Sequence, residues 1–215
     1  MDLNVPTGSE GEDSGRAGRR TQARQRLLAA AKEVFEEVGF HPARVDDIAA
    51  RAGVSHGSFY NYFKSKQDIF RALAQSIDQD LEQTESFLAE GDVTAPQEGM
   101  RLAIRRNFER FRRDARIMDV IAEVCHIDAE VAKARRNLHD RETIRLAKLI
   151  SVLQRNNVAD RRLNPDIAAT ALTAMAWRFK ERWFITGEIQ CDFETGVEQF
   201  FQLVLNALGM KRSAR

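Results

Sequence analysis

The sequence predicts an all-α protein of about nine helices, with a small amino-terminal helical domain and a larger carboxy-terminal one. Three observations indicate this fold class. Apolar residues recur at steps of three and four along most of the 215 residues, which is the helical period. Only four prolines interrupt the chain, and no segment reads convincingly as a strand. The composition, 43% hydrophobic and 30% charged, is typical of a globular protein with a sizeable core.

The amino-terminal segment divides into an acidic part and a basic part. Residues 1–18 are rich in Gly, Ser and acidic residues, so we expect a disordered tail. Five arginines but no acidic residue lie within residues 16–26. This basic stretch is either a solvated linker or an arm that lies along phosphates or in the minor groove of DNA. The first helix is expected over Thr21–Val38, ended by Gly39.

Residues 45–66 predict two short helices joined by a tight turn. Ile48, Ala49 and Ala52 recur at helical spacing and define the apolar face of the first helix. Gly53 stands where a helix ends in a left-handed residue. Ser55 follows at a position where its hydroxyl can cap a second helix. That second helix is expected to reach Phe63.

The outward face of this second helix is small and polar, and it carries no carboxylate. A helix that enters the DNA major groove needs such a face, because its first residues must reach base edges without repelling phosphate. Gly57 has no side chain, so DNA can approach its backbone closely. The alternative is a small surface helix rich in turn formers. The residues of the face are His56, Gly57, Ser58, Tyr60 and Asn61.

The rest of the chain predicts six further helices. Ser65–Asp68 resembles a capping box that opens a fourth helix. We therefore expect a tail at 1–18, a helix-turn-helix domain at 19–66, a helical domain at 67–209 and a basic tail at 210–215. A loop is expected over Gly91–Gly99. The later helices are expected around residues 102–111, 117–124, 128–154, 165–186 and 192–208.

The run Gly39–Phe70 resembles the DNA-binding domain of the TetR family of bacterial transcriptional regulators. The resemblance implies a dimeric regulator, usually a repressor, that binds a palindromic operator and is released by an inducer. One departure is Ala43-Arg44, where the family usually has two threonines, one of which caps the next helix and touches phosphate. The matching segments are Gly39-Phe40, Asp47-Ile48-Ala49, Ala52-Gly53-Val54-Ser55, Gly57-Ser58-Phe59-Tyr60, Tyr62-Phe63 and Lys64-Ser65-Lys66.

The resemblance suggests roles for individual residues on DNA. Tyr60, Tyr62 and Lys66 look like phosphate contacts, which set position. His56, Ser58 and Asn61 are the candidates for base edges. The alternative for Tyr62 is core packing with its hydroxyl at the rim. The full predicted DNA-binding set is Arg44, Ser55, His56, Gly57, Ser58, Tyr60, Asn61, Tyr62 and Lys66.

A protein that recognises palindromic DNA must itself have two-fold symmetry. The last two helices carry wide apolar faces, which fit the four-helix bundle through which members of the family form dimers. The alternative is that both faces are used within one monomer. The predicted dimer residues are Met175, Phe179, Trp183, Phe193, Val197, Phe200, Phe201 and Val204.

The family also implies a small-molecule pocket in the second domain. The local residues suggest a largely apolar effector, such as a lipid-like, aromatic or acyl-thioester compound, with an anionic end near Arg105, Arg106, Arg112 or Arg113. The alternative is that these apolar residues are plain core. The candidate pocket walls are Ile104, Phe108, Phe111, Ile117, Ile121 and Trp177.

Other classes of function have less support. No glycine-rich phosphate loop, catalytic triad or metal motif is present, so we expect neither an enzyme nor a bound cofactor. Glu123, Cys125, His126 and Asp128 cluster, but ordinary surface and helix-end roles explain them better than a metal site. A helical adaptor that binds protein is the second alternative. Two isolated cysteines, an acidic amino terminus unlike a signal peptide and the absence of a long apolar run favour the cytoplasm.

Overall fold

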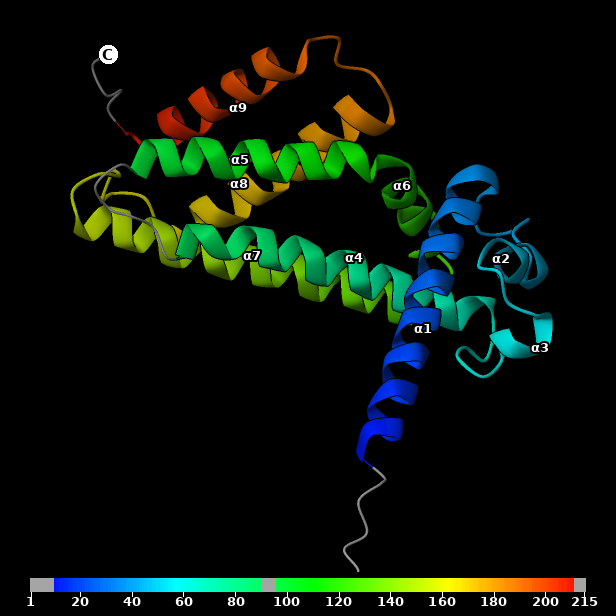
Figure 1. Cartoon of the computed structure of the whole chain (residues 1–215). Coiled ribbons are helices and arrows are strands. Elements are labelled where there is room, and N and C mark those ends of the chain that lie inside the picture. Colours follow the sequence, from blue (N-terminus) through cyan, green and yellow to red (C-terminus); the bar gives the residue numbers. More distant parts are fainter. Residues whose placement is uncertain (1–9, 90–95, 211–215) are drawn as a thin grey trace, which may run out of the picture. The chain divides into compact units, whose positions relative to one another are not determined.

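The computed structural model describes residues 10–89 and 96–210, and within these residues it contains nine α-helices, one π-helical turn and no strand (Figure 1). The all-α prediction is therefore confirmed. The helices are α1 Glu10–Val38, α2 Val45–Arg51, α3 His56–Phe59, α4 Lys66–Ala89, α5 Pro96–Arg113, α6 Ala115–Val124, α7 Ala129–Arg155, α8 Pro165–Lys180, the π-helical η1 Glu181–Ile185 and α9 Phe193–Ala207.

Helix α1 begins at Glu10, well before the predicted start at Thr21. The predicted disordered tail is therefore wrong from Glu10 onward, whereas residues 1–9 lie outside the described part of the chain. The basic stretch is also helical, and a role on DNA stays a prediction. Arg, Ala and Gln, which dominate residues 19–26, are good helix formers, so a helix that starts in the apolar stripe can extend through them.

The chain forms two compact units, Met1–Leu73 and Ala74–Arg215, and the division falls within α4 instead of at its start. The reason is aromatic packing. The ring of Phe70 on α4 lies 5.0 Å from Phe35 of α1 and 4.9 Å from Phe40, both edge to face. These buried rings, with Ile48 and Phe59, form the core of the first unit. The first turns of α4 therefore belong to the first unit.

In the second unit α7 packs along α8, and α5 packs along α9 (Figure 1). The core between these helices is aromatic, with Phe108 at 4.9 Å from Phe200 and Phe179 at 5.4 Å from Trp183. Phe201 and Val204 of α9 are buried in the same core.

This packing corrects the predicted dimer surface. Five of its residues are buried within the single chain, because α9 turns its apolar face toward α5 and the π-helical turn. The alternative, in which one monomer uses both faces, holds for these five. Met175, Phe179 and Phe193 are partly buried against the same core. The five buried residues are Trp183, Val197, Phe200, Phe201 and Val204.

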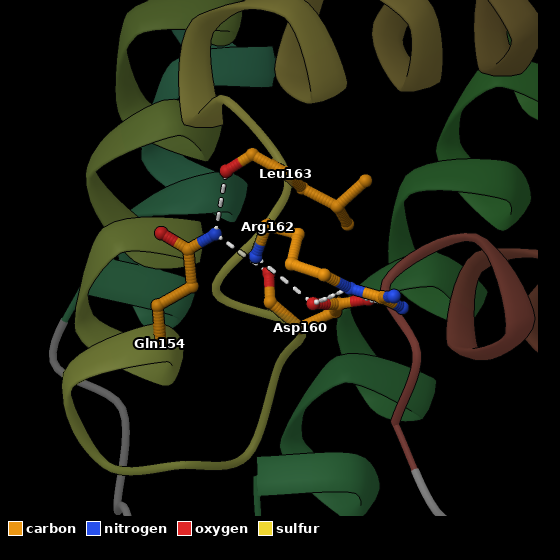
Figure 2. Close-up of polar contacts among 4 residues, drawn as sticks. All are labelled: Gln154, Asp160, Arg162 and Leu163. Carbon is orange, nitrogen blue, oxygen red and sulfur yellow. Dashed lines mark hydrogen bonds and ion pairs between the residues drawn. The ribbon is translucent and has the colours of Figure 1, made fainter.

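The loop between α7 and α8 is held by side chains, as Figure 2 shows. The Gln154 amide nitrogen donates to the carbonyl oxygens of Asp160 and Leu163, both at 2.8 Å. Arg162 donates to the Asp160 carboxylate at 2.7 Å, and this hydrogen bonding lowers the pKa of Asp160 to about 2. The Asp160 backbone N–H also donates to Leu208 at the end of α9. The loop therefore fixes where α8 begins relative to α7 and α9.

Two predicted helix starts in the second unit are confirmed in atomic detail. Asn164 caps α8 by accepting from the N–H groups of Asp166 and Ile167 at 2.9 and 3.1 Å. Asp192 caps α9 by accepting from the N–H of Thr195 at 2.9 Å. Across the described ranges, no helix is both long enough and apolar enough to cross a membrane.

Candidate nucleic-acid interface and ligand cavity

The turn between α2 and α3 has the geometry that its sequence predicts. Gly53 adopts a φ of +67°, which ends α2 in the left-handed region. Ser55 then caps α3, since its hydroxyl oxygen accepts from the N–H of Ser58 at 3.1 Å. The two serine hydroxyls also bond each other at 2.8 Å. Ser55 and Ser58 therefore fix the start of α3.

Regular α-helix in this segment is shorter than predicted. Helix α3 ends at Phe59, and residues 60–62 form a turn that tightens into i→i+3 hydrogen bonds, with Asn61 N–H donating to Ser58 and Tyr62 N–H to Phe59. His56, Gly57, Tyr60 and Asn61 are exposed, whereas Ser58 and Tyr62 are partly buried. The predicted face therefore exists, although its last residues lie on a turn.

His56 faces Asp46 of α2, and its Nδ1 is hydrogen bonded to the Asp46 carboxylate. Because a carboxylate accepts, Nδ1 carries the hydrogen. In the neutral ring Nε2 then accepts, which suits an amino group on a base edge more than the guanine acceptors. The first turn of α2 carries two carboxylates, Asp46 and Asp47, which interact favourably with the positive end of the helix dipole.

Gly57 lies in open space. A Cβ built at this position would meet no described heavy atom within 4 Å, and its φ is not in the left-handed region. The fold of this unit therefore does not itself require glycine at position 57. A close approach by a binding partner is a physical reason for the absence of a side chain there.

Lys66 has a structural position that the sequence did not reveal. Its ammonium donates to the carbonyl oxygens of Phe40, His41 and Ala43 at 2.8, 2.8 and 2.9 Å, and it lies 4.8 Å from the Phe40 ring. These bonds use all three N–H groups, and desolvation lowers the pKa of Lys66. In this structure Lys66 therefore ties the link before α2 to α4, and its phosphate contact stays a prediction.

Arg44 is exposed at the start of α2, and among the described residues its side chain makes no cap hydrogen bond. The departure from the threonine pattern thus leaves α2 without a side-chain cap. At the other end of α2, Arg51 donates to both oxygens of Glu37 on α1 at 2.6 and 2.7 Å. This pairing lowers the pKa of Glu37. Arg19, Arg20, Arg24 and Arg26 are exposed along α1.

The second unit has a partly open cavity of about 160 Å³ between α5, α7, α8 and α9. Three of the six predicted pocket residues line it: Ile104, Phe108 and Trp177. The other apolar residues of the wall are Met100, Ala103, Leu146, Leu149, Leu172, Ala176, Phe200 and Val204. Sequence reasoning did not assign these residues to a pocket, although the leucine stripe of α7 was a visible signal for Leu146 and Leu149.

The other three predicted pocket residues lie elsewhere in the core. Phe111 is buried and packs edge to face against Trp177 at 5.2 Å, behind the cavity wall. Ile117 and Ile121 are buried on α6. Helical spacing shows that such residues face inward, but it cannot separate a cavity wall from filled core.

The polar groups that line the cavity are Asn107, Glu142, Arg145, Thr173 and Lys180. Lys180 is only 5% exposed. Its ammonium donates to Asn107 Oδ1 at 2.8 Å and lies 5.0 Å from the Phe111 ring and 5.6 Å from the Trp177 ring. Sequence reasoning missed Lys180, because its neighbours Arg178, Glu181 and Arg182 make this stretch look like a solvated charged face.

The predicted anion-binding arginines have other roles. Arg105 pairs with Glu194 and with Glu109, and Arg112 lies over the Phe193 ring at 4.2 Å. Arg113 contacts Asp114 at 3.2 Å. Among the described residues that line the cavity there is none of these three arginines, nor is there the exposed Arg106.

The cluster at the end of α6 is a helix junction. Asp128 caps α7 by accepting from the N–H groups of Glu130 and Val131 at 3.0 and 3.2 Å. Within residues 10–89 and 96–210, no three His, Cys, Asp or Glu side chains gather where they could hold a metal ion.

Comparisons with known proteins agree with this architecture. A family model described as bacterial regulatory proteins, tetR family, matches residues 27–73. The HTH-type transcriptional repressor BepR of Brucella suis biovar 1 (strain 1330) is 30% identical over 179 residues, which span 77% of this chain and 84% of BepR.

Two solved structures show the same fold. FadR from Bacillus subtilis, in complex with stearoyl-CoA, has a TM-score of 0.70 at 21% identity over 85% of this chain and 98% of FadR. SmeT, the repressor of the Stenotrophomonas maltophilia multidrug efflux pump SmeDEF, has a TM-score of 0.69 at 20% identity over 86% and 89%. The helix-turn-helix geometry, the family match and the extended similarity to BepR lead to one conclusion: this chain belongs to the TetR family of bacterial transcriptional regulators.

Proposed function

We propose that this regulator is a repressor that binds a palindromic operator as a homodimer and releases it when a small, largely apolar effector fills the cavity. The observation that carries the DNA-binding role is the exposed face of α3, where His56, Tyr60 and Asn61 surround the open position of Gly57. Repression is supported by BepR and SmeT, which are both named as repressors.

We assign the DNA contacts by exposure and chemistry. Tyr60 is 48% exposed and Arg44 is exposed at the start of α2, so both can reach phosphates and set the position on DNA. Asn61 is exposed and can bond adenine through two hydrogen bonds. Tyr62 is partly buried, which fits packing with a hydroxyl at the rim.

A dimer is required because α3 is too short to be selective alone, and a palindrome places two half-sites about 34–36 Å apart. Since five of the eight predicted interface residues are buried within one chain, we assign the interface to exposed apolar residues. Ile167 on α8 is 71% exposed and Leu203 on α9 is 52% exposed. Ala171 and Ala174 continue the exposed side of α8. These outward faces of α8 and α9 are our proposed dimer surface.

The cavity supports a small effector. Its walls are mostly aliphatic and aromatic, and about 160 Å³ is less than the ~300–1,000 Å³ of drug-sized sites. FadR, which was solved with stearoyl-CoA, supports the choice of an apolar ligand class for this fold. We assign the chain no catalytic step, and DNA as its partner implies the cytoplasm.

The test is fluorescence anisotropy of the purified protein with DNA from upstream of its own gene, at several salt concentrations. We expect the affinity for this DNA to exceed the affinity for unrelated DNA. The affinity should also fall steeply with salt concentration, because phosphate contacts release counterions. Tyr60→Phe should weaken binding to all DNA, whereas Asn61→Ala should change the preferred base. Tyr62→Phe is the matched control and should change little. Salt-independent binding without sequence preference would instead favour the helical adaptor.

A further inference from the structure

A buried cation is built into the wall of the apolar cavity. Lys180 is 5% exposed, and its contacts include the neutral Asn107 amide oxygen at 2.8 Å and the rings of Phe111 and Trp177. An amide oxygen and aromatic faces orient an ammonium through dipole and cation–π attraction. Because desolvation of a charge is costly, an anion that enters the cavity gains an attraction that a neutral ligand does not.

The charges that line the cavity are unequal in sign. Lys180 and Arg145 are positive and Glu142 is negative, so the lining carries one excess positive charge. A negatively charged ligand end is therefore favoured over a positively charged one.

The backbone next to Lys180 is irregular in a way that supports a functional role. The π-helical turn Glu181–Ile185 starts directly after Lys180, and its i→i+5 bond joins Thr186 N–H to the Glu181 carbonyl oxygen at 3.0 Å. Such turns are rare and are frequent at functional sites. This turn interrupts the helical register at the residue that carries the cation.

The size of the cavity limits the ligand. A cavity of about 150 Å³ lined by apolar side chains is known to hold one benzene molecule. The cavity here, at about 160 Å³, suits one aromatic ring or a short acyl chain with a compact polar end. The charged end of a coenzyme A ester would have to lie outside this volume.

From these observations we propose that the effector is a small apolar monocarboxylate whose carboxylate lies at Lys180 and Asn107. This inference rests on the proposed effector role of the cavity and names the chemical class of its ligand. The ring or acyl chain lies against Phe108, Leu146 and Leu172. Lys180 then selects acids over their neutral analogues.

The first experiment compares matched probes on the full-length wild-type chain by isothermal titration calorimetry. The pairs are benzoate with benzamide, phenylacetate with phenylacetamide, and octanoate with octanamide. We expect at least one carboxylate to bind about 10- to 100-fold more tightly than its amide, as a charge-assisted hydrogen bond implies. Equal affinity within every pair, or no binding by any probe, would overturn the proposal.

The second experiment removes the charge. Lys180→Met keeps the length of the side chain and should abolish the preference for the acid, whereas Lys180→Arg should keep part of it. Lys148→Met is the matched control, because Lys148 is exposed on α7 and outside the cavity lining. A preference that survives in Lys180→Met would overturn the proposal. So would octanoyl-CoA that binds more tightly than octanoate and is unaffected by the variant.

Anisotropy with operator DNA in the same samples separates this proposal from the proposed function. A carboxylate that binds at Lys180 but leaves DNA binding unchanged would support the anion site and refute the effector role. DNA binding that persists while no carboxylate is preferred would refute the anion site and leave the regulator intact.

Discussion

A Cβ atom at Gly196 would lie 2.0 Å from Cη2 of Trp183, so the indole occupies the space that any other side chain at this position needs. Gly196 lies in the first turns of α9, and Trp183 lies in the π-helical turn after α8. Both residues are buried. The close approach of these two elements therefore depends on the missing side chain, and it places Trp183 against the aromatic core.

Gly196→Ala should lower the free energy of unfolding by about 1–3 kcal/mol, the usual cost of an added methyl group in a packed core. Urea denaturation followed by tryptophan fluorescence measures this change. Gly99→Ala is the matched control, because a Cβ there meets no described heavy atom within 4 Å on α5. That control should be neutral or stabilising by up to about 1 kcal/mol. If Gly196→Ala had the same free energy of unfolding as the wild type, the Trp183 indole would be able to move aside for the added methyl group.

Lys66→Met should destabilise the amino-terminal unit by about 1–3 kcal/mol, because the carbonyl oxygens of Phe40, His41 and Ala43 lose their donor. The salt dependence of DNA binding should stay the same, since each lost phosphate contact would reduce its slope by about 0.9. Lys64→Met, at an exposed neighbour, is the stability control. A reduced slope with unchanged stability would establish Lys66 as a phosphate contact.

Gly57→Ala should leave thermal stability unchanged or slightly raised, because its Cβ enters open space and alanine favours helix. Its affinity for operator DNA should fall about 10-fold or more if DNA approaches this backbone closely, since a steric conflict of 1–3 kcal/mol has that effect. Anisotropy and a thermal melt on the same sample measure the two effects. Full affinity would mean that α3 stands farther from the base edges than we propose.

The stability of the second unit should fall with pH below about 6.5. Burial, together with the charges of Arg135 and Lys180 and against an opposing effect of Asp140, lowers the pKa of His139 from 6.5 to about 4. Because the folded pKa is depressed, the unfolded chain binds a proton between pH 4 and 6.5 that the folded chain does not. Stability is therefore complete above pH 6.5 and is lost progressively toward pH 4.

His139→Phe tests this relation, because a phenyl ring can keep the contact that His139 makes with Trp177 at 4.9 Å between centroids. Among the described residues His139 Nε2 is buried without a hydrogen-bond partner, so its loss should cost little at pH 7. Urea unfolding between pH 4 and 7 should become less pH-dependent. His126→Phe, at an exposed histidine, should keep the wild-type slope. Identical slopes in both variants would rule out His139 as the group.

Much of the fold was predictable because its signals are local. Apolar periodicity located the helices, and Gly53 and Ser55 predicted the turn and the cap as the structure has them. The start of α1 was not predictable from apolar periodicity, since the polar residues before Thr21 carry no such stripe. Local signals also failed at α3, where the regular helix ends at Phe59 and residues 60–62 tighten into a turn.

Taken alone, the sequence determined the fold class, the helix-turn-helix and its exposed polar face, because helical spacing and capping depend on residues close in the chain. Only the tertiary structure decided which inward residues are core, cavity wall or dimer surface. It buried Phe200 and Val204 within one chain, brought Lys180 to the cavity and gave the Lys66 ammonium three backbone partners. The reason is physical: spacing fixes which face of a helix turns inward, but only the packing of distant helices fixes what that face meets.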